Sequence, residues 1–482
     1  MNNQVQDTTI PLVADLDGTL IDTDLLFEAL ILLIKKNPLY IFTCFLWVFK
    51  GRAYLKAKVF ALVQIQYELL PYNTAVLEFL QAEFAKGRKI ILATASPYTA
   101  AMEVAKVHPL FSEVYGSTND INLKSAAKLN LLVKNFGDKQ FDYIGNSSAD
   151  LVIFASSRNA YLANASKTVE RKAKKIATVT VIAGLKKLSL KDYIKAIRAY
   201  QWIKNLLLFV PLVTSHSYGS VKLLTLSFFG FCIFSLVASA GYLLNDLLDL
   251  NADRKHPRKK FRPVASGKIA IPTAVITAVL FLAAGLFFAA QLNWWFLCIV
   301  IFYFITSFSY SLFLKRIVLY DVFILALLYS VRVFAGAIVI DVVLSFWLIA
   351  FSTFIFLSLA FVKRYSELIQ LIQSEGETNL KDRGRGYIVQ DINLLQVMGI
   401  ASGFLAVVVF SLYINSPEIT QLYSKPRILW AISFLFLFWI SRIWLFTTRG
   451  KMTDDPIVFA LKDVTSYFVF LITGVLILLA SI

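Results

Sequence analysis

The feature that most constrains this chain is a series of long apolar stretches that fills its second half. A helix needs about 20 consecutive apolar residues to cross the hydrocarbon core of a bilayer, so this pattern predicts an all-α, polytopic membrane domain. We expect about nine transmembrane helices, the first of them short, at 203–215, 223–244, 270–290, 294–312, 318–340, 344–362, 395–414, 428–446 and 464–482.

The composition agrees with a membrane protein. Hydrophobic residues make up 58% of the 482 residues and charged residues only 16%, whereas soluble domains carry about 25% charged residues. The three cysteines form no spaced pattern, which argues against a disulfide framework and a cysteine-based zinc site. The net charge of +17 fits basic cytoplasmic loops and anionic phosphate ligands. No basic segment with interleaved aromatic residues indicates nucleic acid as a partner.

The charges of the loops predict the orientation in the membrane. On one side, lysines and arginines gather in the loops at 254–268, 315–316, 363–385 and 449–451. The other side carries only Lys222, Lys425 and Arg427. Because positively charged loops stay in the cytoplasm, we expect a multi-pass protein of the inner (cytoplasmic) membrane with the first set of loops on the cytoplasmic side. The N-terminal half joins that side.

The N-terminal half has a different pattern. Short apolar strands at 11–14, 89–93 and 141–144 alternate with helical patterns, which is typical of an α/β domain. We expect this domain in residues 1–166, a basic linker in 167–190, and the membrane domain in 191–482.

One segment of the N-terminal half, residues 25–49, is strongly apolar but interrupted by Lys35, Lys36, Asn37 and Pro38. A hairpin that spans the membrane is one interpretation. A helical cap of the first domain, resting on the bilayer surface, is the interpretation that we favour.

Two carboxylates, Asp15 and Asp17, follow the first predicted strand and precede Gly18. Residues two apart at a strand end point the same way, and Gly18 allows a tight turn there. Such a pair suits Mg²⁺ binding and covalent phosphoryl transfer, in which one carboxylate attacks phosphorus and the other handles protons. An acidic turn after a strand is the alternative explanation.

The run DxDGTL after an apolar strand resembles the haloacid dehalogenase (HAD) phosphatase superfamily, over about residues 9–165. The resemblance implies an α/β, Rossmann-like fold with a helical cap, in which Asp15 is the nucleophile and Asp17 the general acid and base. It also implies that Thr94 donates a hydrogen bond to the phosphoryl group. Lys128 is expected to be the cation that screens the repulsion between the nucleophile and the phosphate, and Lys124 is the alternative.

The segment from Tyr143 to Asp150 resembles the fourth motif of the same superfamily. The resemblance implies a Mg²⁺ site made by Asp15, Asp17, Asn146 and Asp150. The superfamily often has aspartate where this chain has Asn146, and an asparagine offers an oxygen without charge. A structural HAD domain without activity is therefore the alternative.

A second acidic cluster follows the second predicted span. Asp246, Asp249 and Asp253 are spaced i, i+3 and i+7, so a helix would carry all three carboxylates on one face, with Asn245 beside them. Carboxylates at a membrane-embedded helix end are costly unless a cation binds them. Mg²⁺ bridging a diphosphate suits this arrangement, whereas a solvated loop of mixed charge is the alternative.

NDxxDxxxD in such a protein resembles the UbiA superfamily of intramembrane prenyltransferases, over about residues 190–482. The run from Tyr310 to Arg316 also looks like a motif of that superfamily. The usual second DxxxD is absent, because Leu325 stands four residues after Asp321.

Further runs resemble one branch, the decaprenyl-phosphate phosphoribosyltransferases. They are DRxHPxKxxRPxAxG from Asp253, and the segments at 198–205, 362–367 and 454–456. The reaction of that branch joins C1 of phosphoribosyl pyrophosphate (PRPP) to a polyprenyl phosphate and releases pyrophosphate. The resemblance implies that the three aspartates hold Mg²⁺ and PRPP with help from Asn245, and that Asp246 and Asp249 are catalytic.

Both substrates of that reaction are anionic, so the site needs many cations. The candidates for substrate binding are Lys204, Asn205, Lys259, Arg262, Tyr310, Lys315, Arg332 and Lys363. Arg332 falls inside a predicted span, where a functional role is the default interpretation. A structural pair with Asp321 or Asp341 is the alternative.

Together the two halves suggest consecutive steps. The membrane domain would make polyprenyl-phosphoryl-5-phosphoribose, and the HAD domain would remove its 5-phosphate to leave polyprenyl-phosphoryl ribose. The alternatives are an aromatic polyprenyltransferase whose HAD domain acts on an unrelated phosphate, and a lipid scaffold or transporter without activity. The sequence predicts a bilayer, PRPP and a polyprenyl phosphate as partners and makes no prediction of oligomeric state.

Overall fold

The computed structural model of the chain describes residues 9–481 except 119–120, 187, 376–385, 418, 420–422, 453–454 and 461. Asp454 and the basic residues at 381–385 therefore lie outside the described residues. The chain forms two compact units: residues 1–197 with 243–277, and residues 198–242 with 278–482. Each is described by itself.

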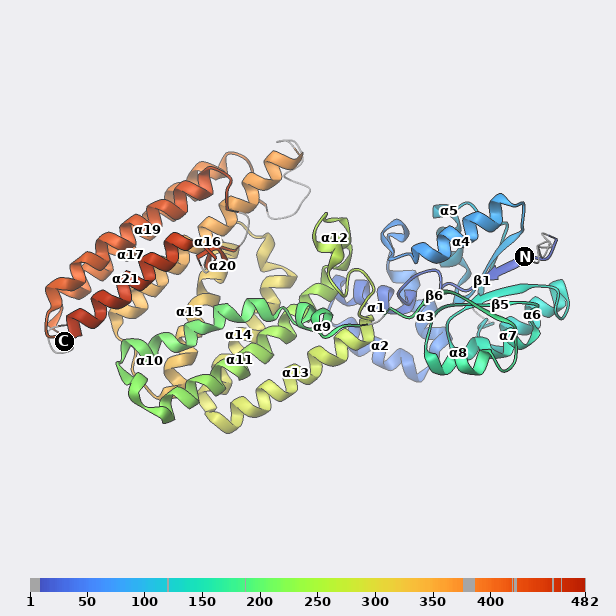
Figure 1. Cartoon of the computed structure of the whole chain (residues 1–482), viewed down its shortest axis with the longest axis horizontal. Helices are drawn as coiled ribbons and strands as arrows, with labels where there is room; N and C mark the ends of the chain where they lie inside the picture. Colours follow the sequence, from blue (N-terminus) through green and yellow to red (C-terminus); the bar gives the residue numbers. More distant parts are fainter. Residues whose placement is uncertain are drawn as a thin grey trace, which may run out of the picture. The chain divides into compact units, whose positions relative to one another are not determined.

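A parallel sheet forms the centre of the first unit (Figure 1). Its six strands are β1 (Leu12–Ala14), β2 (Ile90–Pro97), β3 (Glu113–Ser117), β4 (Asp142–Gly145), β5 (Ala160–Ala165) and β6 (Val179–Gly184), in the order β3-β2-β1-β4-β5-β6. Val13 pairs with Ile91 on one side and with Tyr143 on the other. The strand order places β1 between β2 and β4, so the residues that follow these three strands meet at one edge.

Helices cover both faces of the sheet. They are α4 (Thr74–Ala85), α5 (Tyr98–Val107), α6 (Ala126–Phe136), α7 (Leu151–Ser156) and α8 (Lys167–Ala173). Alternate strand residues belong to different cores: Leu12 and Leu92 pack in one hydrophobic cluster, and Val13 and Ile91 in another. The structure confirms the prediction of an α/β domain, because the apolar runs are strands buried on both faces.

Three helices are inserted between β1 and α4: α1 (Leu25–Lys36), α2 (Tyr40–Phe49) and α3 (Arg52–Leu62). They share a small core that includes Ala29, Leu33, Cys44, Leu55 and Val59. Of the two interpretations of residues 25–49, this geometry agrees with the cap, because neither α1 nor α2 has the roughly 20 residues that a span requires.

Residues 167–190, which their composition suggests to be a linker, contribute to the α/β domain. They contain α8 and β6, and β6 pairs with β5 from Ala160 opposite Val179 onward. The sheet therefore continues beyond residue 166. Basic side chains on α8 and apolar residues in β6 are compatible with an exposed helix and an edge strand.

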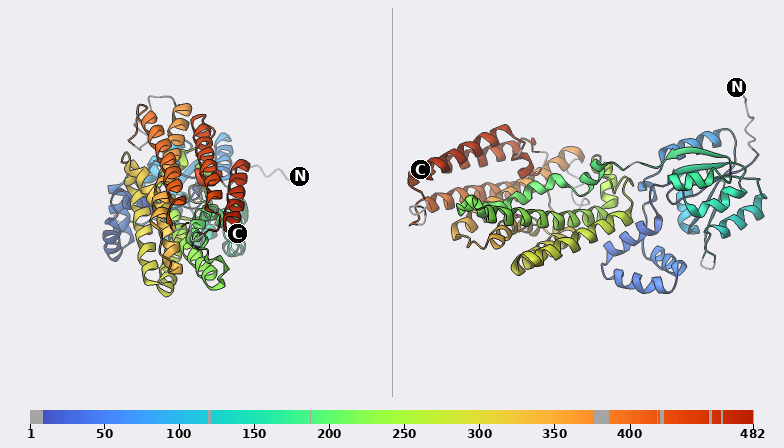
Figure 2. Two further views of the ribbon diagram at one scale, coloured as in Figure 1. Left: turned by 90° about the vertical axis from the view of Figure 1, so that its left-hand side faces the viewer. Right: turned by 60° about the horizontal axis from the view of Figure 1, so that its bottom comes forward.

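Eight helices among the described residues are long and apolar enough to cross a membrane. They are α11 (Val221–Leu248), α13 (Ile271–Leu292), α14 (Trp294–Leu312), α15 (Tyr320–Ile340), α16 (Phe346–Glu375), α17 (Asp391–Ile414), α19 (Trp430–Thr448) and α21 (Val464–Ser481). Figure 2 shows the helices of the second unit running side by side.

Residues 203–215, the first of the nine predicted spans, do not form a membrane-spanning helix, so this prediction is wrong. This segment is the 3-10 helix η3 (Ala199–Phe209) followed by the five-residue helix α10 (Val210–Thr214). Pro211 occupies the first turn of α10, where proline is accepted because no backbone donor is needed. Lys204 and Asn205 are buried in η3 against polar partners, so this segment is shaped by its polar contacts.

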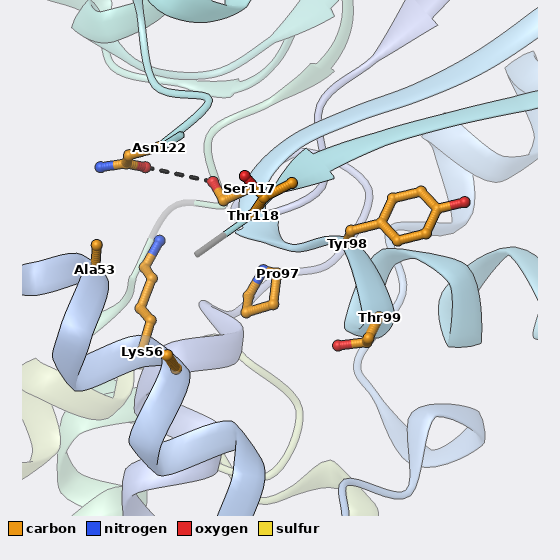
Figure 3. Close-up of a pocket in the computed structure, with 9 residues that line it drawn as sticks. Ala53, Lys56, Pro97, Tyr98, Thr99, Ser117, Thr118 and Asn122 are labelled. Atoms are coloured by element: carbon orange, nitrogen blue, oxygen red, sulfur yellow. Dashed lines mark hydrogen bonds between the residues drawn. The ribbon is translucent and has the colours of Figure 1, made fainter. Parts of the chain in front are cut away.

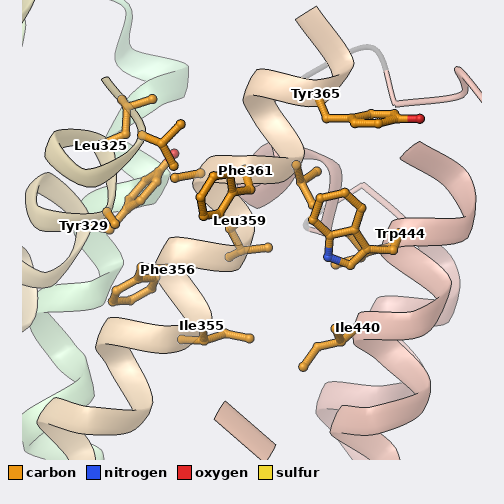
Figure 4. Close-up of a cluster of buried hydrophobic side chains, with 14 of the residues drawn as sticks. Leu325, Tyr329, Ile355, Phe356, Leu359, Phe361, Tyr365, Ile440 and Trp444 are labelled. Carbon is orange, nitrogen blue, oxygen red and sulfur yellow. The ribbon is translucent and has the colours of Figure 1, made fainter. Parts of the chain in front are cut away.

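Helix α15 lies at the centre of the second unit, because 72% of its most apolar stretch is buried. At Gly336 a Cβ atom would lie 2.1 Å from the carbonyl oxygen of Leu208, so η3 packs directly on the backbone of α15. On the other side, Tyr329 of α15 packs against Phe356 of α16 within the hydrophobic cluster shown in Figure 4. These contacts fix the positions of η3 and of Tyr329.

Candidate functional site

Polar side chains gather where β1, β2 and β4 end. Asp15 directly follows β1, Thr94 and Ser96 belong to β2, and Asn146 follows β4. Because these parallel strands are neighbours, the sheet brings the predicted residues of the N-terminal domain to one edge, as is usual for ligand sites of open α/β sheets.

A chain of hydrogen bonds links Asp15 to Asp150. Lys128 Nζ donates to Asp15 Oδ1 at 2.6 Å and to the Tyr143 hydroxyl at 3.0 Å. The Tyr143 hydroxyl donates to Asp150 Oδ1 at 3.0 Å. Lys128 is buried and Lys124 is exposed, so the structure brings Lys128 rather than Lys124 to the predicted nucleophile.

Asp17 is held by donors from two segments. Ser96 Oγ donates to Asp17 Oδ2 at 2.7 Å and Thr94 Oγ1 donates to the same oxygen at 3.4 Å. The backbone N–H of Leu25 donates to Oδ1 at 2.9 Å. Burial raises the pKa of Asp15 to about 7, although Lys128 opposes the shift, and burial raises the pKa of Asp17 to about 6. Carboxylates shifted in this way are typical of functional sites.

The loops after β1 and β4 pack closely on each other. A Cβ atom on Gly18, whose φ is +76°, would lie 2.1 Å from Asn146 Nδ2. Asp150 Oδ2 accepts hydrogen bonds from Ser147 N at 2.9 Å and Ser147 Oγ at 2.7 Å. A glycine at position 18 therefore allows both the positive φ of the turn and the close approach of Asn146. This contact places Asn146 beside Gly18, the residue that follows Asp17.

A cavity of about 240 Å³ opens between α3 and the ends of β2 and β3 (Figure 3). Its lining includes Lys56 of α3, Pro97 of β2 and Asn122. Lys56 Nζ donates to the carbonyl oxygen of Ala95 at 2.7 Å. Ala95 lies between Thr94 and Ser96, so the cavity adjoins the backbone that carries both donors to Asp17.

A second acidic site lies in the first unit, after α11. Arg262 Nη1 donates to Asp246 Oδ1 at 3.0 Å and to Asp253 Oδ2 at 2.5 Å, and both carboxylates are buried. Burial raises the pKa of Asp253, with Arg262 acting in the opposite direction. Two carboxylates thus converge on one positive charge.

The helix that was expected to carry all three aspartates is interrupted. Helix α11 ends at Leu248, and Asp249 precedes the short helix α12 (Leu250–Lys255). Asp249 Oδ1 lies 3.5 Å from Lys35 Nζ, whereas the other two aspartates contact Arg262. Asn245 lies in the last turn of α11, and Lys259 lies in η5 (Lys259–Phe261), where its charge lowers the pKa of Asp253.

Both acidic clusters are candidate sites for Mg²⁺. Among the described residues, no three Asp, Glu, His or Cys side chains are grouped closely enough to hold a metal ion by themselves. Mg²⁺ is commonly held by one or two carboxylates together with substrate phosphates and water. The two buried carboxylates of Asp246 and Asp253, which both bond to the Arg262 guanidinium, fit that mode of binding.

The second unit contains a polar cluster around Asp455. Lys204 Nζ donates to Asp455 Oδ2 at 2.6 Å, the Tyr329 hydroxyl donates to the same oxygen at 3.0 Å, and Lys363 Nζ lies 3.5 Å from it. Burial alone would raise the pKa of Asp455, but Lys204 and Lys363 hold it well below its ordinary value. Asp455 was not predicted as a site residue, although the run at 454–456 was a signal.

Arg332 lies next to this cluster and is also buried. It donates to Asn205 Oδ1 at 2.8 Å and to the Tyr303 hydroxyl at 2.9 Å. Asp321 forms an ion pair with Arg364 instead. The structure therefore does not show the pair between Arg332 and Asp321 that was one structural alternative. Asp341, the other candidate partner, is exposed at the end of α15.

Two predicted residues lie elsewhere in the second unit. Tyr310 is near the end of α14, where Arg364 Nη2 donates to its hydroxyl at 3.5 Å. Lys315 is half-buried in η6 (Leu314–Arg316). The Asp455 cluster thus contains Lys204 and Lys363 of the predicted residues, with Asn205 and Arg332 beside it.

Comparison with known proteins gives the family. Residues 206–371 match the model of the UbiA prenyltransferase family. The chain belongs to this family. This UbiA-family chain is 34% identical over 465 residues to y4nM, an uncharacterized protein of Sinorhizobium fredii, and the match covers 96% of the chain and 89% of that relative.

Two other relatives match parts of the chain. The nodulation protein NoeC of Azorhizobium caulinodans is 33% identical over 282 residues, which are 58% of this chain and 90% of that protein. The decaprenyl-phosphate phosphoribosyltransferase of Mycolicibacterium smegmatis is 37% identical over 202 residues, 40% of this chain and 62% of the relative. The chain thus spans less than two thirds of the phosphoribosyltransferase.

Proposed function

We propose that this UbiA-family protein transfers the 5-phosphoribosyl group of PRPP to a polyprenyl phosphate, and that its N-terminal domain, a HAD phosphatase, then removes the ribose 5-phosphate. The observation that carries the proposal is the buried cluster in the second unit. Among the described residues of this cluster, the buried Lys204 and Arg332 and the half-buried Lys363 outnumber one carboxylate, that of Asp455. Loop charges support placing the phosphate chemistry of both domains in the cytoplasm.

This excess of cations, of which Lys204 and Arg332 are buried, favours an anionic acceptor. A buried positive charge is costly unless an anion binds it, and a lipid phosphate supplies that anion. A neutral aromatic acceptor does not need three cations. The carboxylate of Asp321, where a second acidic motif would begin, is already paired with Arg364 and Tyr387. Both facts favour the phosphoribosyl reaction over aromatic prenyl transfer, and the similarity to phosphoribosyltransferases agrees.

The acidic cluster after α11 is the candidate site for the donor. Asp246, Asp249 and Asp253, with the side-chain oxygen of Asn245, would hold Mg²⁺, which when bound neutralises the diphosphate of PRPP. Arg262 holds Asp246 and Asp253 together in the structure. In the complex, Arg262 and Lys259 bind the outer phosphate oxygens, because guanidinium and ammonium groups suit phosphate.

In the transfer step, an oxygen of the lipid phosphate forms a bond to C1 of ribose. The bond between C1 and the pyrophosphate oxygen breaks, and pyrophosphate leaves with the electron pair. Lys204, Lys363 and Arg332 neutralise the charge of the lipid phosphate and orient it as the acceptor. The hydroxyl of Tyr329 keeps Asp455 in position beside them.

In the phosphatase step, Asp15 attacks phosphorus and forms an aspartyl-phosphate, while Asp17 gives a proton to the departing 5-oxygen. Asp17 then takes a proton from the water that hydrolyses the intermediate. Its raised pKa, about 6, suits both roles. Lys128 screens Asp15 from the phosphate, and Asp15, Asp17, Asn146 and Asp150 would hold Mg²⁺. Tethering raises the concentration of the second site near the first product.

The identity of the acceptor distinguishes phosphoribosyl transfer from aromatic prenyl transfer. Purified protein in nanodiscs would receive either PRPP with a polyprenyl phosphate or a polyprenyl diphosphate with an aromatic acid, each with Mg²⁺. We expect a PRPP-dependent lipid product in the first mixture and no prenylated aromatic product in the second. A prenylated aromatic product, with none from PRPP, would overturn the proposal in favour of aromatic prenyl transfer.

A further inference from the structure

We propose that helix α2 of the cap lies in the surface of the lipid bilayer and that the N-terminal domain takes its phosphate substrate from a membrane lipid. The substrate class in this inference rests on the proposed phosphatase activity. The position of α2 does not, because it follows from the surface of the cap alone.

Helix α2 exposes an unusual amount of apolar surface. Phe42, Phe45 and Phe49 are 69%, 65% and 75% exposed, and only Cys44 of this helix is buried. The same surface includes the exposed side chains of Leu39, Ile41, Leu46 and Val48. No charged residue occurs between Tyr40 and Phe49. A contiguous apolar surface of this kind on a folded domain marks an interaction with another apolar body.

The charges around α2 identify a bilayer as the partner. Lys36 ends α1 before it and Lys50 follows it, and Lys35, also in the last turn of α1, is paired with Asp249. No aspartate or glutamate occurs between Glu28 and Glu68. An apolar helix bordered only by basic residues is complementary to a membrane with anionic headgroups. The described residues include eight candidate spans, so a bilayer surrounds this protein, and the ten residues of α2 are too few to cross it.

Helix α2 is connected by one glycine-containing turn to the wall of the phosphate site. Helix α3 follows it, and Ala53, Lys56 and Ala57 of α3 line the cavity of about 240 Å³. Lys56 bonds to Ala95, next to Ser96, the donor to Asp17. A helix in the headgroup layer therefore places this cavity close to the phosphates of membrane lipids, which is where a lipid-linked phosphate monoester is found.

The position of α2 is tested with a fluorophore in nanodiscs that contain nitroxide-labelled lipid. In a full-length background with Cys44, Cys232 and Cys298 replaced by alanine, Phe45→Cys places the fluorophore on α2. Phe84→Cys, an exposed position of α4, is the matched control. We expect the lipid nitroxide to quench position 45 several-fold more than position 84. Equal quenching at both positions would overturn the membrane contact.

The source of the substrate is tested with the double variant Phe42→Glu/Phe45→Glu and the control Phe84→Glu. The double variant should hydrolyse the lipid-linked 5-phosphate, made in the nanodisc from labelled PRPP, several-fold more slowly than wild type. Both variants should hydrolyse soluble p-nitrophenyl phosphate at the wild-type rate, which also shows that the domain is folded. An unchanged rate on the lipid would overturn the lipid source. A wild-type protein that hydrolyses neither compound would refute the phosphatase, and the quenching result would still decide the position of α2.

Discussion

Arg254 donates two hydrogen bonds to the carboxylate of Glu28, at 3.0 and 2.7 Å, and both side chains are almost completely buried. The two residues are 226 positions apart. Arg254 Nε also donates to the carbonyl oxygen of Ala265 at 3.0 Å, and Glu28 accepts a hydrogen bond from Thr23 at 2.8 Å. The pair therefore joins the cap helix α1 to the segment that carries the second acidic cluster, within the first unit.

Removing one partner of this pair should destabilise the first unit. Arg254→Met leaves the Glu28 carboxylate buried and uncompensated, which costs about 3–5 kcal/mol. The double variant Glu28→Met/Arg254→Met should regain part of this loss, because neither charge remains. Hydrogen exchange of α1 in the full-length protein measures the effect. Lys268→Met, which removes an exposed pair with Asp192, is the control and should change little.

The cation beside the predicted nucleophile should control hydrolysis. Lys128→Met removes the 2.6 Å contact with Asp15 and should lower phosphate hydrolysis about 10²-fold or more, as the loss of a preorganised charge does. Lys124→Met changes an exposed lysine of the same segment and should leave the rate near that of wild type. Release of phosphate from p-nitrophenyl phosphate is the measurement. If the Lys124 variant loses more activity than the Lys128 variant, the assignment of the cation is wrong.

Acid should weaken the sheet through Asp142. This fully buried carboxylate accepts hydrogen bonds from Arg158 Nε at 3.0 Å and from Asn159 N at 2.9 Å, and also pairs with Arg88. Burial would raise the pKa of Asp142, but the hydrogen bonds from Arg158 and Arg88 lower it below its usual 3.8. Because its pKa is lowered on folding, the Asp142 carboxylate stabilises the folded state fully when the pH is above the pKa of the unfolded state, about 3.9. This stabilisation is lost as the pH falls through the pKa of the folded state.

We therefore expect hydrogen exchange of the β4 amides to accelerate as the pH falls below about 4, after correction for the intrinsic pH dependence of exchange. Asp142→Asn should already be destabilised at neutral pH and should show a flatter pH dependence. Asp138→Asn, at an exposed position, is the control. A wild-type profile no steeper than that of Asp142→Asn would contradict the account.

The buried cations of the second unit should serve the transfer and not the hydrolysis. Lys204→Met should reduce formation of the labelled lipid about 10²-fold, while hydrolysis of p-nitrophenyl phosphate stays at the wild-type level. Lys222→Met, at the exposed start of α11, should change neither activity. Full transfer activity in the Lys204 variant would remove this cluster from the substrate site.

Much of the N-terminal site was predictable because it follows from strand order. The resemblance to the HAD superfamily named Asp15, Thr94 and Asn146, and the strand order brings them together because residues at the ends of neighbouring parallel strands meet at one edge of the sheet. Ser96 could also have been predicted as a site residue, because it lies on the same face of the strand as Thr94. Lys128 was predicted over Lys124 from the resemblance, and the geometry agrees because α6 begins after Ser125, whose φ is +52°, and carries Lys128 to Asp15.

The polar contacts between distant segments were not predictable. Asp455 and Lys204 are 251 positions apart, and only the packing of η3 on α15 brings them together. Hydropathy alone did not separate η3 and α10 from a true span, because both are apolar on average while Lys204 and Asn205 make specific contacts. The pair of Glu28 and Arg254 likewise has no local signal, since each residue resembles an ordinary surface charge in sequence.

The most direct test of the two-step account is a lipid-product assay in membranes. Wild type and Asp15→Asn would each receive labelled PRPP, a polyprenyl phosphate and Mg²⁺, and the labelled lipids would be separated by charge. The account predicts lipid-linked ribose from wild type and lipid-linked ribose 5-phosphate from Asp15→Asn, with no labelled lipid when Mg²⁺ is removed. Lipid-linked ribose 5-phosphate from both proteins would contradict the second step, and the absence of any labelled lipid would contradict the first.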